Sequence, residues 1–231
     1  MLAVHSSSPW LGVALADSGR VLCEEVLPPA KKHLENLAPL IKELTRRVAI
    51  GFQEIDGFGV AIGPGSFSGI RVGLATVKGM ALAAKKPVVG VGSLEIIAMQ
   101  GLNEGESAAS VIDARRNEIY AALWRKENDR ILLIDGPVLG STDILKSWAD
   151  GIGNKLVLCG ESVVEQTAES NPGLFRARVL IPSAAVCARI AWQRLSVGDE
   201  DHIHTLTPLY IRKSDAQEKR EHPASRVARP I

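Results

Sequence analysis

The feature that most constrains the fold is an order of strands and helices that occurs twice along the chain. In each half, three closely spaced strand-like runs are followed by alternating helical and strand-like segments, and the second round begins near Ala109. A three-stranded meander followed by helix–strand units predicts a mixed sheet covered by helices. The repeat therefore predicts an α/β protein built from two related lobes.

The first lobe is expected to end at a polar, glycine-containing stretch, Asn103–Ser107, which is typical of a boundary. Pro39 lies inside a long amphipathic helix and is expected to kink or restart it. Asp17-Ser18-Gly19 predicts a hairpin turn. Strands are expected at 2–5, 11–16, 20–26, 57–62 and 88–91, and helices at 31–48, 67–84 and 93–101.

The second lobe is expected to repeat this order with less regular elements. Strands are predicted at 109–113, 118–124, 130–134, 156–159 and 178–180, and helices at 142–148, 163–169 and 183–197. The predicted domains are thus residues 1–105, an N-terminal lobe that, on the resemblance given below, would carry the dimerisation helices, and residues 106–231, a C-terminal lobe with a basic tail. The segment from Ile211 onward contains six Lys or Arg residues and three acidic residues. Such a tail is typically solvated, and contact with RNA stays open.

Composition indicates a globular cytoplasmic protein. Hydrophobic residues make up 46% of the 231 residues and charged residues 23%, and the net charge is +1. No run approaches the roughly 18 apolar residues that span a bilayer, and Met1–Val4 lead directly into a strand-like run with no leader pattern. The three cysteines, Cys23, Cys159 and Cys187, are too few and too far apart to predict a disulfide framework or a zinc site.

A glycine-rich loop, Gly63–Gly73, joins a predicted strand to a predicted helix. Such a loop can hold an anion, so Gly63, Gly65, Ser66 and Ser68 are candidates for anion contact. The spacing fits neither the phosphate loop, the dinucleotide fingerprint nor the nucleophile elbow. A structural turn is favoured, with Ser66 or Ser68 capping the helix.

The helix after this loop has an unusually smooth second side. Ile70, Leu74, Val77 and Ala81 gather on one side, and only Arg71 and Lys78 are charged. A surface helix should carry a polar arc. The other side instead carries Val72, Gly73, Thr76, Gly79, Met80 and Ala83. This arc predicts contact with a helix of a partner protein, and the alternative is burial on both sides by the chain itself.

Duplicated lobes of this kind are typical of the actin, sugar-kinase and Hsp70 class, whose lobes have the RNase H-like fold. In that class, carboxylates at the ends of the first strands organise Mg²⁺ and phosphates. Here Asp113 ends the first strand of the second lobe, whereas the first lobe offers His5 and three serines. One carboxylate makes a poor magnesium site. We therefore expect no metal, no cofactor and no catalytic residue, and Asp113 is expected to act as a turn or capping residue.

Four segments together resemble one protein family. Four segments occur in the order found in the bacterial TsaB proteins, also called YeaZ. They are Leu2-Ala3-Val4, Gly63-Pro64-Gly65-Ser66-Phe67-Ser68-Gly69-Ile70-Arg71, Ile112-Asp113-Ala114-Arg115 and Tyr210-Ile211-Arg212-Lys213-Ser214-Asp215-Ala216. The resemblance covers nearly the whole chain, and the Gly-Pro-Gly-Ser-Phe block is its most specific part. His5 departs from the acid that the family usually has there, which weakens any nucleotide site.

The resemblance implies a role in placing threonylcarbamoyl on N6 of the adenosine next to the anticodon of tRNA. It implies a non-catalytic subunit that pairs with its paralogue TsaD, which carries the metal and the transfer chemistry, in a heterodimer visited by the small ATPase TsaE. It further implies pairing through the helices at 33–48 and 67–84, so that Leu40 and Leu44 join the predicted partner surface, and self-pairing when TsaD is absent. tRNA contact through the complex stays open.

Two enzymatic alternatives stay open. One is an active ATP-dependent phosphotransferase of the actin-like fold, with Asp113 and the 63–69 loop at the phosphates. The other is a peptidase with a triad of Ser66, His5 and Asp113, which nothing in their spacing supports. His202 and His204 are expected to lie in a surface loop rather than to hold a metal ion.

Overall fold

The computed structural model describes residues 1–29, 33–152 and 155–212. The tail from Lys213 onward, with most of its basic residues, lies outside the described residues. None of the helices in these three ranges is long and apolar enough to cross a lipid bilayer.

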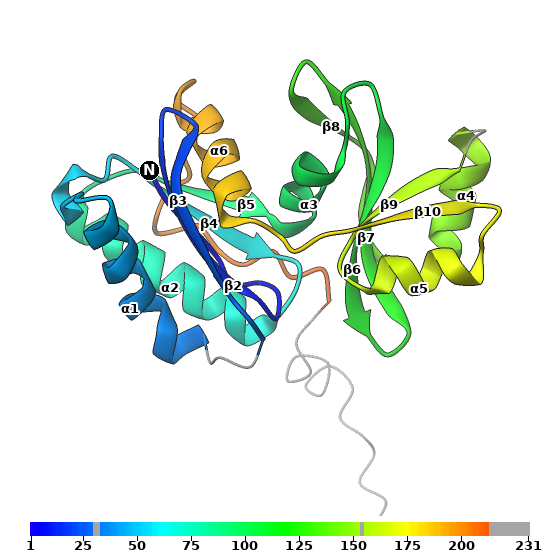
Figure 1. Ribbon diagram of the computed structural model, residues 1–231, viewed down its shortest axis with the longest axis horizontal. Coiled ribbons are helices and arrows are strands. Elements are labelled where there is room, and N and C mark those ends of the chain that lie inside the picture. The colour runs from blue at the N-terminus through cyan, green and yellow to red at the C-terminus, as the bar shows by residue number, and fades with distance from the viewer. Residues whose placement is uncertain (30–32, 153–154, 213–231) are drawn as a thin grey trace, which may run out of the picture.

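Two five-stranded mixed sheets of the same design form the frame of the molecule (Figure 1). The first has the order β3(Arg20–Leu27), β2(Leu11–Asp17), β1(Leu2–His5), β4(Phe58–Gly63), β5(Val88–Gly92). The second has the order β8(Arg130–Gly140), β7(Glu118–Glu127), β6(Ser107–Arg115), β9(Leu156–Gly160), β10(Phe175–Val179). In both, the first three strands in sequence are antiparallel and the last two are parallel to the central strand. The prediction of two RNase H-like lobes of the actin, sugar-kinase and Hsp70 class is confirmed.

The helices cover both sheets, and two of them pack across the expected boundary at residue 105. α1(His33–Arg47) and α2(Phe67–Ala84) lie on one face of the first sheet. Its other face is covered by α6(Ala184–Leu195), which follows the second sheet in sequence (Figure 1). Conversely, α3(Ser93–Gly101) packs mainly on strands of the second sheet, whose remaining helices are α4(Asp143–Ile152) and α5(Val163–Ser170). A 3-10 turn, η1(Phe52–Glu54), precedes β4.

Most predicted elements are confirmed, β10 begins three residues before the expected 178–180, and two further elements differ for identifiable reasons. The hairpin turn at Ser18 and Gly19 is present, with φ of 47° and 80°, as a tight hairpin requires. α1 runs through Pro39 without a restart, because its buried leucines hold it against the sheet on both sides of the proline. β8 extends six residues further than the expected end at Ile134, to Gly140. Gly136 sits within it at φ 91°, so close to β7 that a Cβ would lie 2.9 Å from the Ala121 carbonyl oxygen.

The main core of the first lobe lies between its sheet and the helices α1 and α2. It joins apolar residues of β1, β2 and β4 to both helices. Leu74 of α2 is part of this core, whereas Leu82, two turns later, is 51% exposed. The two leucines therefore report on a buried and an exposed part of the surface of one helix.

Truncating Leu74 should destabilise the chain far more than truncating Leu82. We expect Leu74→Ala to lower the free energy of unfolding by roughly 2–5 kcal/mol because it leaves a cavity in the core. Leu82→Ala should change it by less than about 0.5 kcal/mol. Urea unfolding of both variants beside the wild type measures the difference. Equal losses for the two variants would contradict the orientation of α2.

Candidate functional site

The glycine-rich loop between β4 and α2 packs directly onto the β1–β2 connection. The Ser66 amide donates to the Ser7 carbonyl at 2.7 Å. A Cβ at Gly65, whose φ is 148°, would lie 2.1 Å from the Ser7 carbonyl oxygen, and one at Gly69 would lie 2.0 Å from that of Ser6. The Ser66 hydroxyl accepts the Gly69 amide at 3.3 Å and caps α2, as predicted. Contacts within the chain thus account for the glycines of the loop.

The four residues proposed for anion contact are placed differently from one another. Gly65, Ser66 and Ser68 line a cleft between the lobes, whereas Gly63 is buried in β4. A Cβ at Gly63 would lie 2.9 Å from the Leu209 carbonyl oxygen. Anion contact by the remaining three stays a prediction.

The cleft between the lobes has a volume of about 1580 Å³. Its first-lobe wall is the 65–69 loop, and its second-lobe wall is the turn between β6 and β7 together with Glu161 and Arg212. The described lining contains three acidic and three basic residues, Asp113, Glu118, Glu161, Arg115, Arg116 and Arg212. Burial raises the pKa of the Glu161 carboxyl, and a hydrogen bond with Ser8 opposes this shift. Because these charges balance, the lining creates no strong positive potential that would attract a polyanion such as a nucleoside triphosphate.

The residues at the ends of the two first strands are engaged within the chain. Asp113 accepts the Arg115 amide at 2.7 Å and forms an ion pair with its guanidinium at 3.2 Å, which confirms its role in a turn. His5 is fully buried, and its Nε2 lies 3.0 Å from the Ser7 hydroxyl. Within the described part of the chain, no three His, Cys, Asp or Glu side chains come together as a metal site.

The imagined triad of Ser66, His5 and Asp113 is not assembled. The hydroxyl of Ser66 is used in the cap of α2, and the serine beside His5 is Ser7. Ser7 in turn lies 2.6 Å from the Ser93 hydroxyl, and both it and His5 are buried. These contacts form a packed polar cluster in which His5 is fully buried.

The cysteines also lack the environment of a reactive thiol. Cys159 and Cys187 are buried, and burial raises the pKa of the Cys159 thiol to about 11. A thiol with so high a pKa is a poor nucleophile at neutral pH.

The outer side of α2 is open, but it is shifted from the predicted arc. We call its exposed residues the α2 face: Phe67, Ser68, Arg71, Ala75, Gly79, Leu82 and Ala83. Of the eight residues predicted to bind a partner, Gly79 and Ala83 lie on this face. Val72, Thr76 and Met80 are half-buried, and Val72 and Met80 pack against the core.

For the other three, Gly73, Leu40 and Leu44, the prediction of a partner contact is wrong. Leu40 and Leu44 point from α1 into the core and are 8% and 0% exposed. Gly73 lies under α2, where a Cβ would meet the Ser6 hydroxyl at 2.2 Å. At 100° per residue Gly73 lies beside Ile70 and Val77 rather than opposite them, so its place on the predicted arc was wrong, and this flank of α2 packs on Ser6 and Val4.

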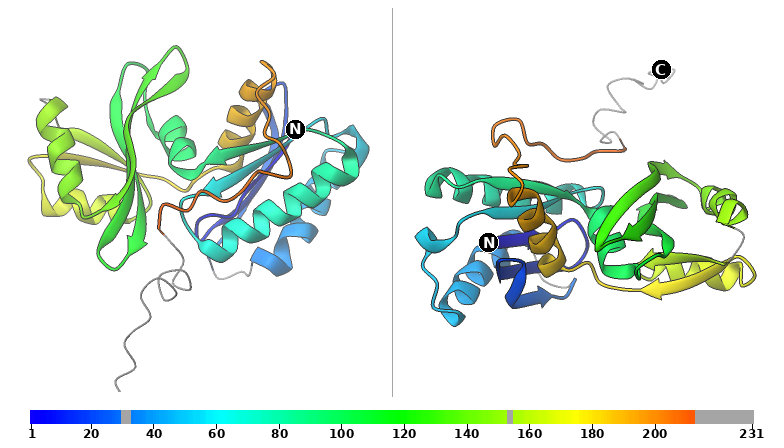
Figure 2. Two further views of the ribbon diagram at one scale, coloured as in Figure 1. Left: turned by 180° about the vertical axis from the view of Figure 1, so that it is seen from behind. Right: turned by 90° about the horizontal axis from the view of Figure 1, so that it is seen from above.

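One flank of α2 is covered by the end of the chain. We call residues 201–212 the C-terminal strap; it runs beside β5 and α2 toward the second lobe (Figure 2). Lys78 Nζ donates to the Leu206 carbonyl at 3.0 Å, and the Leu209 amide donates to the Ile62 carbonyl at 2.8 Å. The strap leaves the α2 face itself exposed.

The strap brings together three segments that lie far apart in the sequence. The Tyr210 ring stacks on Phe67 with the centroids 4.9 Å apart, and its hydroxyl lies 2.8 Å from Arg71 Nε. Two residues later, Arg212 donates to the Ala114 carbonyl at 2.7 Å and pairs with Glu118. Arg71 and Tyr210 were not predicted as site residues. In the sequence, Arg71 and Tyr210 belong to two short motifs far apart along the chain. Only the fold shows that these motifs lie side by side.

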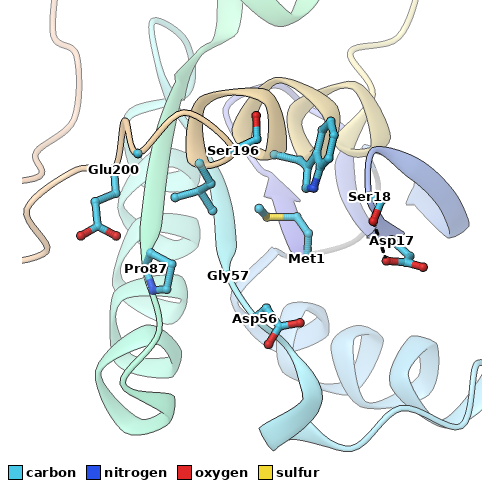
Figure 3. Close-up of a pocket in the computed structure, with 11 residues that line it drawn as sticks. Met1, Asp17, Ser18, Asp56, Gly57, Pro87, Ser196 and Glu200 are labelled. Atoms are coloured by element: carbon cyan, nitrogen blue, oxygen red, sulfur yellow. Dashed lines mark hydrogen bonds between the residues drawn. The ribbon is translucent and has the colours of Figure 1, made fainter.

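A second hollow, of about 340 Å³, lies at the other end of the first sheet (Figure 3). Met1, Trp192 and Leu195 form its apolar wall, and Asp17, Asp56 and Glu200 stand around it. Asp17 accepts the hydroxyl of Ser18, and Asp56 pairs with Lys86. The acidic residues of this hollow are thus partly engaged, and no catalytic grouping forms there among the described residues.

Comparison with known proteins gives a consistent family. A family model described as TsaD, tRNA N6-adenosine threonylcarbamoyltransferase, matches residues 21–145. The chain is 26% identical to the tRNA threonylcarbamoyladenosine biosynthesis protein TsaB of Escherichia coli, over 95% of the chain and 97% of that protein. It is 27% identical to TsaB of Bacillus subtilis, over 95% and 96%. The structure of YeaZ from Pseudomonas aeruginosa has the same fold, with a TM-score of 0.79, 22% identity, and coverage of 90% and 98%.

The two glycines of α2 should respond in opposite directions to a single added methyl group. Gly73→Ala should lower the free energy of unfolding by about 1–3 kcal/mol because the Cβ overpacks against Ser6. Gly79 has open space at its Cβ position, so Gly79→Ala should raise the stability by about 0.5–1 kcal/mol through helix propensity. Urea denaturation measures both. A stabilising Gly73→Ala would contradict the close contact between α2 and β1.

Proposed function

Because this chain belongs to the TsaD family of tRNA N6-adenosine threonylcarbamoyltransferases, on its TsaB (YeaZ) branch, we propose that it is a non-catalytic scaffold subunit. In this proposal it pairs with TsaD and supports the transfer of threonylcarbamoyl to the adenosine next to the anticodon of tRNA. The family takes part in tRNA threonylcarbamoyladenosine biosynthesis; the scaffold role and the pairing are the proposed steps.

The α2 face is the observation that carries the proposal. Its middle consists of Ala75, Gly79 and Ala83, with the exposed Leu82 beside them. Small side chains allow a second helix to approach to the interaxial distance of about 8–10 Å that helix packing requires. An exposed helix face this poor in charge is unusual for a surface that only meets water. A helix of TsaD is the proposed occupant.

The charged residues of the cleft between the lobes support a role without catalysis. Asp113 pairs with Arg115 and Arg212 pairs with Glu118 at the cleft, so these four groups are occupied with each other rather than arranged around a substrate. The proposal therefore assigns the metal and the transfer chemistry to TsaD. TsaE is expected to visit the heterodimer, and tRNA is expected to be held by the complex rather than by this chain alone.

Self-pairing in the absence of TsaD follows from the same surface. A face that accepts a helix of a related protein can accept its own copy around a twofold axis, in an isologous contact. We propose that both assemblies form in the cytoplasm and compete for the α2 face.

Gly79→Leu tests the proposed pairing. A leucine at the centre of the α2 face should hold the two helices apart and abolish the heterodimer, while the chain stays folded because the Cβ position at Gly79 is open. Size-exclusion chromatography with purified TsaD measures the pairing, and circular dichroism measures the fold.

Gly151→Leu is the matched control. Gly151 also lies in a helix, α4 of the second lobe, and its Cβ position is equally open. This variant should pair with TsaD like the wild type. A normal heterodimer with Gly79→Leu, or equal loss in both variants, would show that the α2 face is not the docking surface.

A further inference from the structure

Arg71 is the one charged residue of the α2 face, and its side chain is held in place by two aromatic rings. The guanidinium carbon lies 3.9 Å from the centroid of the Phe67 ring and 5.8 Å from that of Tyr210. Its Nε donates to the Tyr210 hydroxyl at 2.8 Å. A cation over an aromatic ring with a hydrogen bond at its base has far less freedom than an ordinary exposed arginine.

The position of Tyr210 is itself fixed by the C-terminal strap. The Leu209 amide bonds to the Ile62 carbonyl at 2.8 Å on one side of the tyrosine, and Arg212 bonds to the Ala114 carbonyl at 2.7 Å on the other. Leu206 is buried in the core of the first lobe. The strap therefore presents the tyrosine hydroxyl to Arg71 from a rigid base.

This arrangement uses only part of the donor capacity of Arg71. A guanidinium carries five N–H donors, and Tyr210 takes the one on Nε. Within residues 1–29, 33–152 and 155–212, the two terminal nitrogens donate to no protein atom and Arg71 forms no ion pair. Lys78, the other cation of α2, differs because its Nζ is bonded to the Leu206 carbonyl.

We propose that Arg71 is the charged anchor of the α2 face and binds the carboxylate of an Asp or Glu side chain on the docking partner. The inference rests on the proposed pairing with TsaD and names the chemistry of one contact within it. Docking on the α2 face would remove water from the guanidinium, and a buried charge without a partner is costly. Two parallel N–H groups match a carboxylate in a bidentate contact. The partner therefore supplies an acid opposite Arg71.

Tyr210 is a positioning residue in this scheme. It touches no partner atom in the proposed contact but fixes the guanidinium before docking, which lowers the entropy lost on binding. The strap thus belongs to the docking site, although it is separated from α2 by more than a hundred residues in the sequence.

The test measures the affinity of purified TsaD for the wild type and its variants by isothermal titration calorimetry at several salt concentrations. Arg71→Met should weaken binding about 10- to 100-fold, as expected for a lost hydrogen-bonded charge contact. Arg71→Lys should also weaken it, because an ammonium lacks the planar fork. The affinity of the wild type should fall more steeply with salt than that of Arg71→Met. Arg125→Met, which removes an exposed arginine of β7 in the second lobe, should bind like the wild type.

Tyr210→Phe separates positioning from contact. It keeps the stacked ring and removes the hydroxyl, so it should weaken binding less than Arg71→Met does. Its effect should disappear in the Arg71→Met background, as a double-mutant cycle would measure. A purely structural role of Tyr210 would instead give the same loss in both backgrounds, which would contradict the positioning role.

Wild-type affinity or wild-type salt dependence of Arg71→Met overturns the proposal, as does a loss no larger than that of Arg125→Met. Should Arg71→Met unfold at a lower temperature than the wild type, Arg71→Lys decides, because it keeps a cation beside Phe67; wild-type affinity there overturns the proposal. If Arg71→Met binds like the wild type while Gly79→Leu still blocks the heterodimer, the Arg71 contact is wrong and the proposed pairing stands. If Gly79→Leu binds normally, the docking surface itself is wrong.

Discussion

The close contact between α2 and the β1–β2 connection determines the arrangement of the first lobe. Gly65, Gly69 and Gly73 face the serines after β1 so closely that a Cβ at any of them would lie 2.2 Å or less from an oxygen atom. The Ser6 hydroxyl donates to the Gly69 carbonyl at 2.8 Å across the same contact. Because α2 packs closely against the end of β1, much of its surface is buried and the α2 face is the part left exposed. The closeness of packing between α2 and β1 thus determines which residues of α2 a partner can contact.

This dependence explains which parts of the molecule could be predicted from the sequence. Strand and helix positions follow from local periodicity, and the repeated order of elements was enough to predict two related lobes. The candidate site was predicted less well, because small residues on a helix allow close approach to any neighbour. Gly73 uses that property against Ser6 of its own chain, whereas Gly79 has nothing near its Cβ position. At 100° per residue Gly73 lies beside the apolar side of α2 and Gly79 lies opposite it, so the prediction was wrong to place the two glycines on one arc.

The remaining differences come from contacts between residues distant in sequence. α6 packs on the first sheet and α3 on the second, so the helices exchange between lobes although the sheets divide near residue 105. No local pattern encodes this exchange. The C-terminal strap is a similar case, because residues 201–212 contain little regular structure and become interpretable only beside Phe67, Arg71 and Ala114.

The strap also bears on the proposed scaffold role. It fastens the start of α2 to the β6–β7 turn through Tyr210 and Arg212, and Arg212 pairs with Glu118 at the edge of the cleft. Four charged residues of the cleft form two ion pairs, Asp113–Arg115 and Arg212–Glu118, and the second pair ties the strap to the second lobe. A partner seated on the α2 face would therefore contact a helix that is braced against both lobes. A rigid surface loses little entropy on docking, as the proposed scaffold role requires.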